Sequence, residues 1–255
     1  MIHDPRLLQA VLDDPDDDAP RLAYATWCDA HADPDVRAQG DLIRSQIDLA
    51  NTDPDAVRTG QAAGLQQHID TLVERHGAAW RQPISGWVDA VHFVRGFAGW
   101  LECSAQAWLD HGAQIRALAP VQHLNLRGVR DVDERLADSP LLAGIRSLSM
   151  DGCGLHDIHV QLLAASKHVG ELRWISMADN HLGLPASEAL AASTSLGQLA
   201  FVELRSNPVD PVEELGYDGA IVVASTMPPE GQALEAKHGP QKWLHRDDPP
   251  GRFDR

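Results

Sequence analysis

Apolar residues recur at a nearly constant spacing between residues 121 and 210. Each copy of the pattern holds three apolar residues in the order apolar-x-x-apolar-x-apolar, then Asn or Cys, then one more apolar residue. Full copies begin at Ile145, Leu172 and Leu199, and an incomplete copy begins at Val121. The copies start 24, 27 and 27 residues apart, which predicts a chain that repeats one structural unit.

Each copy predicts a short strand followed by a helix. In the copy that begins at Leu172, Ile175 and Met177 would share one face of a strand, because successive side chains point to opposite faces. Helix-like runs rich in Leu and Ala follow at residues 160–165 and 189–192. One such unit cannot bury both of its apolar faces, whereas stacked neighbours form a continuous core.

A polar position closes the pattern. Asn180 and Asn207 occupy it in two copies, where an Asn side chain can satisfy backbone groups as the chain leaves the strand, and Cys153 occupies it in a third. The pattern L-x-x-L-x-L-x-x-N-x-L resembles the leucine-rich repeat family, in which Cys is a known substitute for this Asn. The resemblance implies an α/β fold, a short solenoid over residues 121–211 with parallel strands on the concave face and helices outside.

Four amphipathic helices are expected before residue 80, and their apolar positions centre on Leu8, Trp27, Ile43 and Ile69. We expect the fourth helix to end at Gly77, since glycine favours a left-handed C-terminal cap. The aspartates of residues 16–18 favour capping of the second helix, with metal chelation as the alternative. Residues 7–27 (LLQAVLDDPDDDAPRLAYATW), 41–46 (DLIRSQ) and 76–80 (HGAAW) resemble the bacterial repeat-companion domain, a helical module found in front of leucine-rich repeats. Thr26 departs from that family, which more often has an acidic residue before the Trp. The resemblance implies an all-helical domain over residues 1–80 and no reaction.

Two flanking regions complete the expected organisation. Residues 93–103 predict one strand that bends or bulges at Gly96 and Gly99, and residues 81–120 are expected to form a degenerate capping repeat. Residues 212–255 predict a C-terminal cap and tail, with an edge strand at residues 221–223 and fraying from Asp247 onward. The tail has a second interpretation as a partner-binding peptide.

The chain is strongly acidic, with a formal net charge of −16, and residues 1–60 alone carry −8. This charge disfavours nucleic acid and anionic membranes as partners, because both are bound mainly through Lys and Arg. A protein or peptide partner is expected, while the oligomeric state stays unknown. Three scattered cysteines, no visible signal peptide and no long apolar run favour the cytoplasm of a bacterium.

One group of residues has the composition of a reactive site: Cys153, His156, Asp157 and His159. It suggests a thiolate nucleophile or a metal site. The repeat pattern favours structural roles, because Cys153 takes the Asn position, while His156 and His159 would be exposed in the turn into a helix. Familiar catalytic and nucleotide-binding motifs are missing from the sequence. We therefore predict no catalytic residue, no metal and no cofactor.

The pattern instead predicts a binding surface on the concave side of the strands. Three columns of outward-facing residues are expected: Trp100, His123, Ser147, Trp174 and Phe201; Glu102, Asn125, Ser149, Ser176 and Glu203; Ser104, Arg127, Asp151, Ala178 and Arg205. Aromatic residues beside Arg and Glu are typical of binding hot spots. The alternative is that the C-terminal tail covers Trp174 and Phe201.

The first functional hypothesis is a non-catalytic module that binds a protein or peptide on this concave face. A second hypothesis is an accessory or substrate-presenting partner of a peptide-modifying or biosynthetic enzyme. A third is an enzyme whose site forms only in three dimensions.

Overall fold

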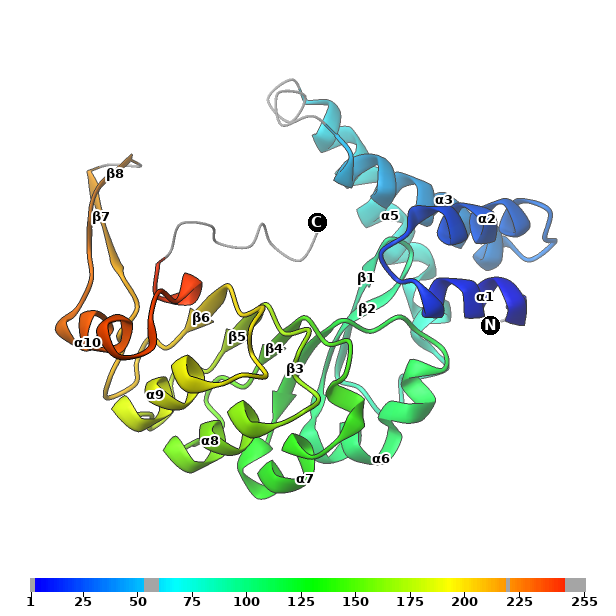
Figure 1. The fold of residues 1–255 in the computed structure, drawn as a ribbon. Coiled ribbons are helices and arrows are strands. Elements are labelled where there is room, and N and C mark those ends of the chain that lie inside the picture. Colours follow the sequence, from blue (N-terminus) through cyan, green and yellow to red (C-terminus); the bar gives the residue numbers. More distant parts are fainter. Residues whose placement is uncertain (1–2, 53–59, 219–220, 246–255) are drawn as a thin grey trace. The chain divides into compact units, whose positions relative to one another are not determined.

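The computed structural model describes residues 3–52, 60–218 and 221–245. These residues form an α/β structure with a six-stranded, mostly parallel sheet, whose strands lie side by side in sequence order from β1 to β6 (Figure 1). No helix within these three ranges is long and apolar enough to cross a membrane. The chain forms two compact units, Met1–Leu101 with His111–Val121 and Glu102–Asp110 with Gln122–Phe253.

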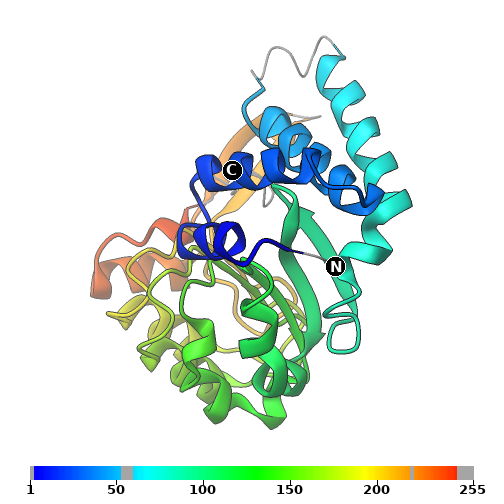
Figure 2. The same ribbon diagram turned by 90° about the vertical axis from the view of Figure 1, so that its right-hand side faces the viewer.

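Helices make up most of the first unit, drawn in blue to cyan in Figure 2: α1 (Pro5–Asp13), α2 (Asp18–Asp29), α3 (Pro34–Ala50) and α5 (Gln61–Arg81). An aspartate precedes each of the first three helices and accepts hydrogen bonds from backbone N–H groups of the first turn: Asp4, Asp17 and Asp33. Such caps satisfy donors that have no partner within the helix. The expectation that aspartates cap the second helix is confirmed at Asp17, which accepts from the Ala19 N–H at 2.9 Å.

The predicted end of the fourth helix at Gly77 is wrong, because α5 continues to Arg81. Gly77 is buried inside the helix, and a Cβ there would lie 3.5 Å from Cε2 of Phe93. The extra turn carries Trp80, which is buried and whose Nε1 donates to the Asp35 carbonyl at 2.8 Å. The glycine thus serves close packing, and burial of Trp80 extends the helix past it.

Residues 93–103 do not form one bent strand as expected. They contribute to a hairpin of β1 (Ala90–Val94) and β2 (Phe97–Ser104), joined by a two-residue turn. Arg95 and Gly96 both have positive φ, 48° and 84°, as two-residue hairpin turns of type I′ require. Gly96 therefore reverses the chain, whereas the strand pattern alone suggested a bulge.

Side chains from α2 and α3 hold this turn. The Gly96 N–H donates to Oε1 of Gln46 at 2.7 Å, and Nε2 of Gln39 donates to the Gly96 carbonyl at 3.2 Å. Arg21, only 2% exposed, donates from Nη1 to the Arg95 carbonyl at 3.0 Å. Burial lowers the pKa of Arg21 to about 10, so it remains charged at neutral pH. The hairpin is thus fixed within the first unit.

The second unit repeats a strand and a helix. Its strands are β3 (His123–Arg127), β4 (Ser147–Ser149), β5 (Trp174–Ser176) and β6 (Phe201–Glu203). Its outer segments are η1 (Val129–Asp131), α7 (Asp133–Ala137), η2 (Pro140–Leu142), α8 (Asp157–Ala165) and α9 (Leu184–Ala192), and α7 to α9 lie along one side of the strands (Figure 1). Helix α6 (Ala105–Arg116) contributes residues to both units. The row that faces the helices is almost fully buried: Leu124, Leu148, Ile175 and Val202.

After β6 the chain forms β7 (Glu214–Asp218), β8 (Ile221–Thr226), α10 (Pro229–His238) and η3 (Lys242–Leu244). Residues 221–223 form a strand as expected, within β8, but β8 pairs with β7 in a separate antiparallel hairpin and does not belong to the six-stranded sheet. β7 supplies a local partner that the sequence pattern did not reveal. The expected fraying from Asp247 lies outside the described residues.

The segment after β8 packs back on the end of the second unit. α10 contacts α9, where Nζ of Lys237 lies 2.8 Å from Oε1 of Glu188, and η3 contacts β6. The Glu213 N–H donates to the Leu244 carbonyl at 2.8 Å, and Leu244 is fully buried. Residues 229–245 therefore cover the last strand and helix of the repeated units.

We predict that Gly96→Ala destabilises the first unit by about 3 kcal/mol, from backbone strain and overpacking. An added Cβ would lie 2.0 Å from Cγ1 of Ile43, and its backbone would keep a φ of 84°. Thermal or urea unfolding measures the change. Gly86→Ala is the matched control, because a Cβ there meets no atom within 4 Å. Equal stability of the two variants would contradict the packing described for the turn.

The C-terminal cap should also depend on pH through His245. Its Nε2 lies 2.7 Å from Oε1 of Glu235 and its Nδ1 3.5 Å from Oε2 of Glu213, and the hydrogen bond to Glu235 is the main reason that its pKa is raised above 6.5. Because the pKa of His245 is higher in the folded than in the unfolded protein, protonated His245 stabilises the fold. This contribution is complete below the unfolded-state pKa of about 6.5, and it is lost as the pH rises through the folded-state pKa.

The stability advantage of the wild type over His245→Gln should therefore shrink between pH 6 and pH 8, as measured by unfolding at each pH. In a Glu235→Gln background the same substitution should show a much smaller pH dependence. A constant advantage at every pH would exclude a charged His245 as a clamp of this cap.

Candidate functional site

The strands of the second unit align, in two rows, the residues on the face opposite the helices; Ser147, Ser176 and Glu203 among them are buried. The register pairs His123 with Ser147, Ser147 with Trp174 and Trp174 with Phe201 in the first row, and Asn125, Ser149, Ser176 and Glu203 likewise in the second. This confirms the alignment that the repeat spacing predicts for these strands. We call these two rows, with Arg127, Asp151, Ala178 and Arg205 at the strand ends, the strand face.

Two aromatic rings lie side by side on the strand face. The rings of Trp174 on β5 and Phe201 on β6 are nearly parallel, with an interplanar angle of 4° and centroids 5.9 Å apart. Both side chains are half-buried, whereas Ser147 at the same position on β4 is small and buried. Along the first row, the large aromatic side chains on β5 and β6 are therefore followed by a small serine on β4.

Hydrogen bonds and ion pairs fix the charged groups of the strand face. Asp151 Oδ1 accepts from Oγ of Ser176 at 2.6 Å and from the Ala178 N–H at 2.8 Å. Oε1 of Glu203 lies 2.9 Å from Nε of Arg205 and accepts from the Arg205 N–H at 3.0 Å. Because these groups already hold defined positions, a partner would lose less side-chain entropy on binding them.

Two arginines that the sequence columns omitted lie where the strands begin. Arg146 and Arg173 directly precede Ser147 and Trp174, and the Arg173 N–H donates to the Arg146 carbonyl at 2.9 Å. Burial and then the charge of Arg146 lower the pKa of His123 to about 4, so His123 is neutral at pH 7. Arg146 and Arg173 are 27 residues apart, and this spacing could have revealed them in the sequence. The columns list only alternating positions within the strands and so leave out the residue before each strand.

The remaining predicted residues lie on β2. Glu102 belongs to the second unit, where its Oε1 lies 3.4 Å from Nε of Arg127. Trp100 belongs to the first unit, where its ring packs edge to face against the ring of His92, with the ring centroids 4.4 Å apart. The pairing of β3 to β6 does not reach Trp100, so its place in the first row stays a prediction.

Asparagine side chains join neighbouring units where the strands end. Oδ1 of Asn180 accepts from the Leu155 N–H at 2.9 Å, and its Nδ2 donates to the Met150 and Met177 carbonyls at 3.0 and 2.9 Å. Asn207 repeats this arrangement one unit later, with the Leu182 N–H at 3.0 Å and the Met177 carbonyl at 2.8 Å. The expectation that these asparagines satisfy backbone groups is confirmed.

A second set of side-chain bonds joins the units after their helices, and the sequence analysis missed it. The hydroxyl of Ser166 donates to the Ala137 carbonyl, and that of Ser193 donates to the Ala164 carbonyl. Ser139 precedes Ser166 by the same 27 residues and accepts from the Leu141 N–H at 3.3 Å. The 27-residue spacing of these serines could have revealed the bonds from the sequence. It does not stand out, because serine is common in turns.

The group of Cys153, His156, Asp157 and His159 has structural partners. The thiol of Cys153 donates to the Leu126 carbonyl at 3.3 Å, and burial raises its pKa, which disfavours the thiolate. Asp157 Oδ1 accepts from the Gly183 N–H at 2.7 Å. Within the described ranges, no three or more His, Cys, Asp and Glu residues gather so that they could hold a metal ion.

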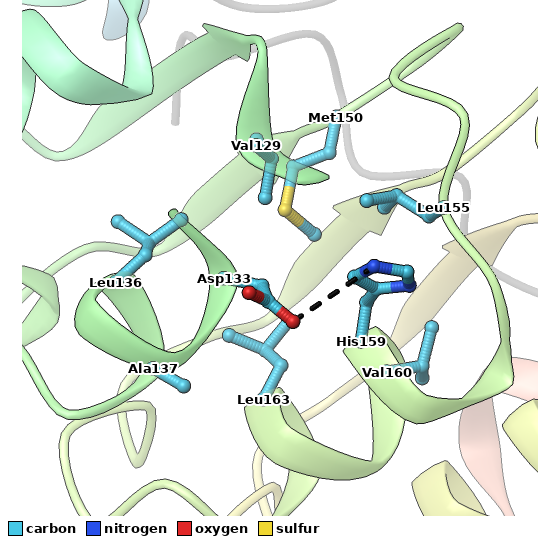
Figure 3. Close-up of a pocket in the computed structure, with 9 residues that line it drawn as sticks. All are labelled: Val129, Asp133, Leu136, Ala137, Met150, Leu155, His159, Val160 and Leu163. Atoms are coloured by element: carbon cyan, nitrogen blue, oxygen red, sulfur yellow. Dashed lines mark ion pairs between the residues drawn. The ribbon is translucent and has the colours of Figure 1, made fainter. Parts of the chain in front are cut away.

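The expectation that His159 is exposed is wrong. Its Nδ1 accepts from the His156 N–H at 2.8 Å, and its Nε2 lies 3.8 Å from Oδ2 of Asp133, across a small cavity (Figure 3). Only 11% of the His159 side chain is exposed, because the histidine closes the gap between α7 and α8. Its side chain is turned toward that gap and not toward solvent.

The cavity beside His159 has a volume of about 10 Å³. Seven apolar residues complete its lining: Val129, Leu136, Ala137, Met150, Leu155, Val160 and Leu163. A single water needs about this much space, whereas ligand pockets commonly measure about 300–1,000 Å³. The cavity is too small to admit a substrate, so the strand face is the better candidate site.

Comparison with known proteins adds no family and no relative: no family model, curated protein or solved structure matches this chain.

We predict that Asn180→Ala and Asn207→Ala each lower the free energy of unfolding by about 1–3 kcal/mol, because each leaves backbone groups without a partner. Asn180 should give the larger loss, since it is 4% exposed and Asn207 is less buried. Urea unfolding measures both. Asn125→Ala, a matched Asn on β3, should change stability by less than about 0.5 kcal/mol. Losses no larger than this control would refute the role of the asparagines.

Proposed function

We propose that the second unit is a short leucine-rich repeat solenoid and that the helices before residue 81 form a repeat-companion domain. Three features support the solenoid: the 27-residue spacing, the parallel register of β3 to β6, and the equivalent bonds of Asn180 and Asn207. In such an architecture the row of strands is an extended binding surface.

We propose further that the protein is a non-catalytic module that binds a protein or peptide on the strand face. The parallel pair of Trp174 and Phe201 is the observation that carries this proposal. Large aromatic side chains supply much contact area at low entropic cost, and interface hot spots are enriched in Trp, Tyr and Arg. Arg173 and Arg205 are exposed and flank the pair at the two ends of the strands.

The shape of the strand face favours an extended peptide or a protruding loop. Adjacent strands lie about 4.8 Å apart, so a short extended peptide laid across β3 to β6 would pass all four strands within about 14 Å. Because Ser147 is much smaller than its neighbour Trp174, a partner side chain could pack against the Trp174 ring above the Ser147 hydroxyl. Arg146 and Arg173 near these two residues favour a partner that carries a carboxylate.

Selection of peptides from a random display library on the immobilised full-length protein tests the proposal. For the best peptides, Trp174→Ala and Phe201→Ala should each weaken binding by about thirtyfold, or roughly 2 kcal/mol, because central aromatic anchors dominate binding energy. Titration calorimetry measures the affinities, and thermal unfolding verifies that each variant is folded.

Ile158→Ala is the matched control, since Ile158 is 55% exposed on α8 within the same unit. It should leave affinity unchanged. Selected peptides whose binding is insensitive to both aromatic substitutions would show that the strand face is not the binding site.

A further inference from the structure

We propose that residues 246–255 of this same chain bind the strand face and compete there with an external partner. The proposal rests on the proposed function, since it treats the strand face as a peptide-binding surface. The segment reads Arg-Asp-Asp-Pro-Pro-Gly-Arg-Phe-Asp-Arg, and it follows directly on the last described residue, His245.

The start of the segment is fixed close to the strand face. Leu244 is fully buried, its carbonyl accepts from the Glu213 N–H at 2.8 Å, and η3 contacts β6. Ten residues can span up to about 33–36 Å when extended. The four strands of the face extend over only about 14 Å from β6 to β3, at about 4.8 Å per step. The segment is therefore long enough to reach every row.

The chemistry of the segment complements the strand face. Phe253 offers an aromatic ring of the kind that packs against Trp174 and Phe201 in offset or edge-to-face geometry. The segment has three aspartates and three arginines and so no net charge, but its two adjacent aspartates, at 247 and 248, can pair with the arginines where β4 and β5 begin, Arg146 and Arg173.

The middle of the segment suits a flat aromatic surface as well. Pro249 and Pro250 favour an extended polyproline conformation, which loses little entropy on binding, and proline-rich segments commonly dock on aromatic surfaces. A tethered ligand also has an effective concentration of about 1 mM. Even a weak intrinsic affinity, near 0.1 mM, would then occupy the face about nine-tenths of the time.

Photo-crosslinking in the full-length protein tests this proposal directly. Phe253→p-benzoylphenylalanine places a photoreactive aromatic group in the segment and needs no truncation. After irradiation and trypsin digestion, the expected product is an intramolecular crosslink to the tryptic peptide of residues 174–205, which holds both Trp174 and Phe201. Adding Trp174→Ala should lower its yield about tenfold, and adding Ile158→Ala should leave it unchanged.

A crosslink confined to other peptides, or a covalent dimer on a denaturing gel, would overturn the proposal. A second measurement compares affinities: Phe253→Ala should bind a selected peptide about tenfold more tightly than the wild type, because the competitor is weakened. Unchanged affinity would also overturn it.

The outcomes separate the two proposals. Library peptides that bind through Trp174, without the crosslink to residues 174–205, leave the peptide-binding function standing and remove the intramolecular competitor. The crosslink with no library peptide bound would leave the competitor standing and contradict the external partner.

Discussion

The repeated structure depends on satisfying backbone groups where each strand ends. A chain that turns away from a buried strand leaves carbonyl and N–H groups that need partners away from water. The amides of Asn180 and Asn207 supply them, each bonding to its own unit and to the preceding one. A residue in the left-handed conformation stands directly before Cys153, Asn180 and Asn207: Gly152, Asp179 and Ser206, with φ between 55° and 61°. One side chain per unit thus fixes both the turn and the spacing.

The proposed binding surface follows from that spacing. Because the units repeat in register, Trp174 and Phe201 lie on adjacent strands with their rings parallel, and Arg173 and Arg205 flank them. The serine bonds behind the helices, from Ser166 and Ser193, join the same units on the opposite side. Side-chain bonds at both ends of each unit hold the strands in register, and a preorganised face of this kind would lower the entropic cost of the proposed peptide binding.

The sequence predicted the parts that depend on periodicity. Spacing alone placed His123, Ser147, Trp174 and Phe201 in one row, because register is a property of the repeat. The sequence prediction failed at glycines, because the same residue type fits more than one local structure. Gly77 suggests a helix end, but in the structure it permits close packing against Phe93. Gly96 suggests a bulge, but it forms a tight turn packed on Ile43. Such choices depend on distant partners that no local pattern reveals.

Fluorine NMR of the full-length protein labelled with 5-fluorotryptophan tests the central claim most directly. The chain has seven tryptophans, and Trp174→Phe identifies the resonance of Trp174. On titration with a selected peptide, that resonance should shift saturably at the affinity measured by calorimetry, while that of Trp80, buried in the first unit, should stay in place. A Trp174 signal that stays unchanged at saturation would contradict a peptide site on the strand face.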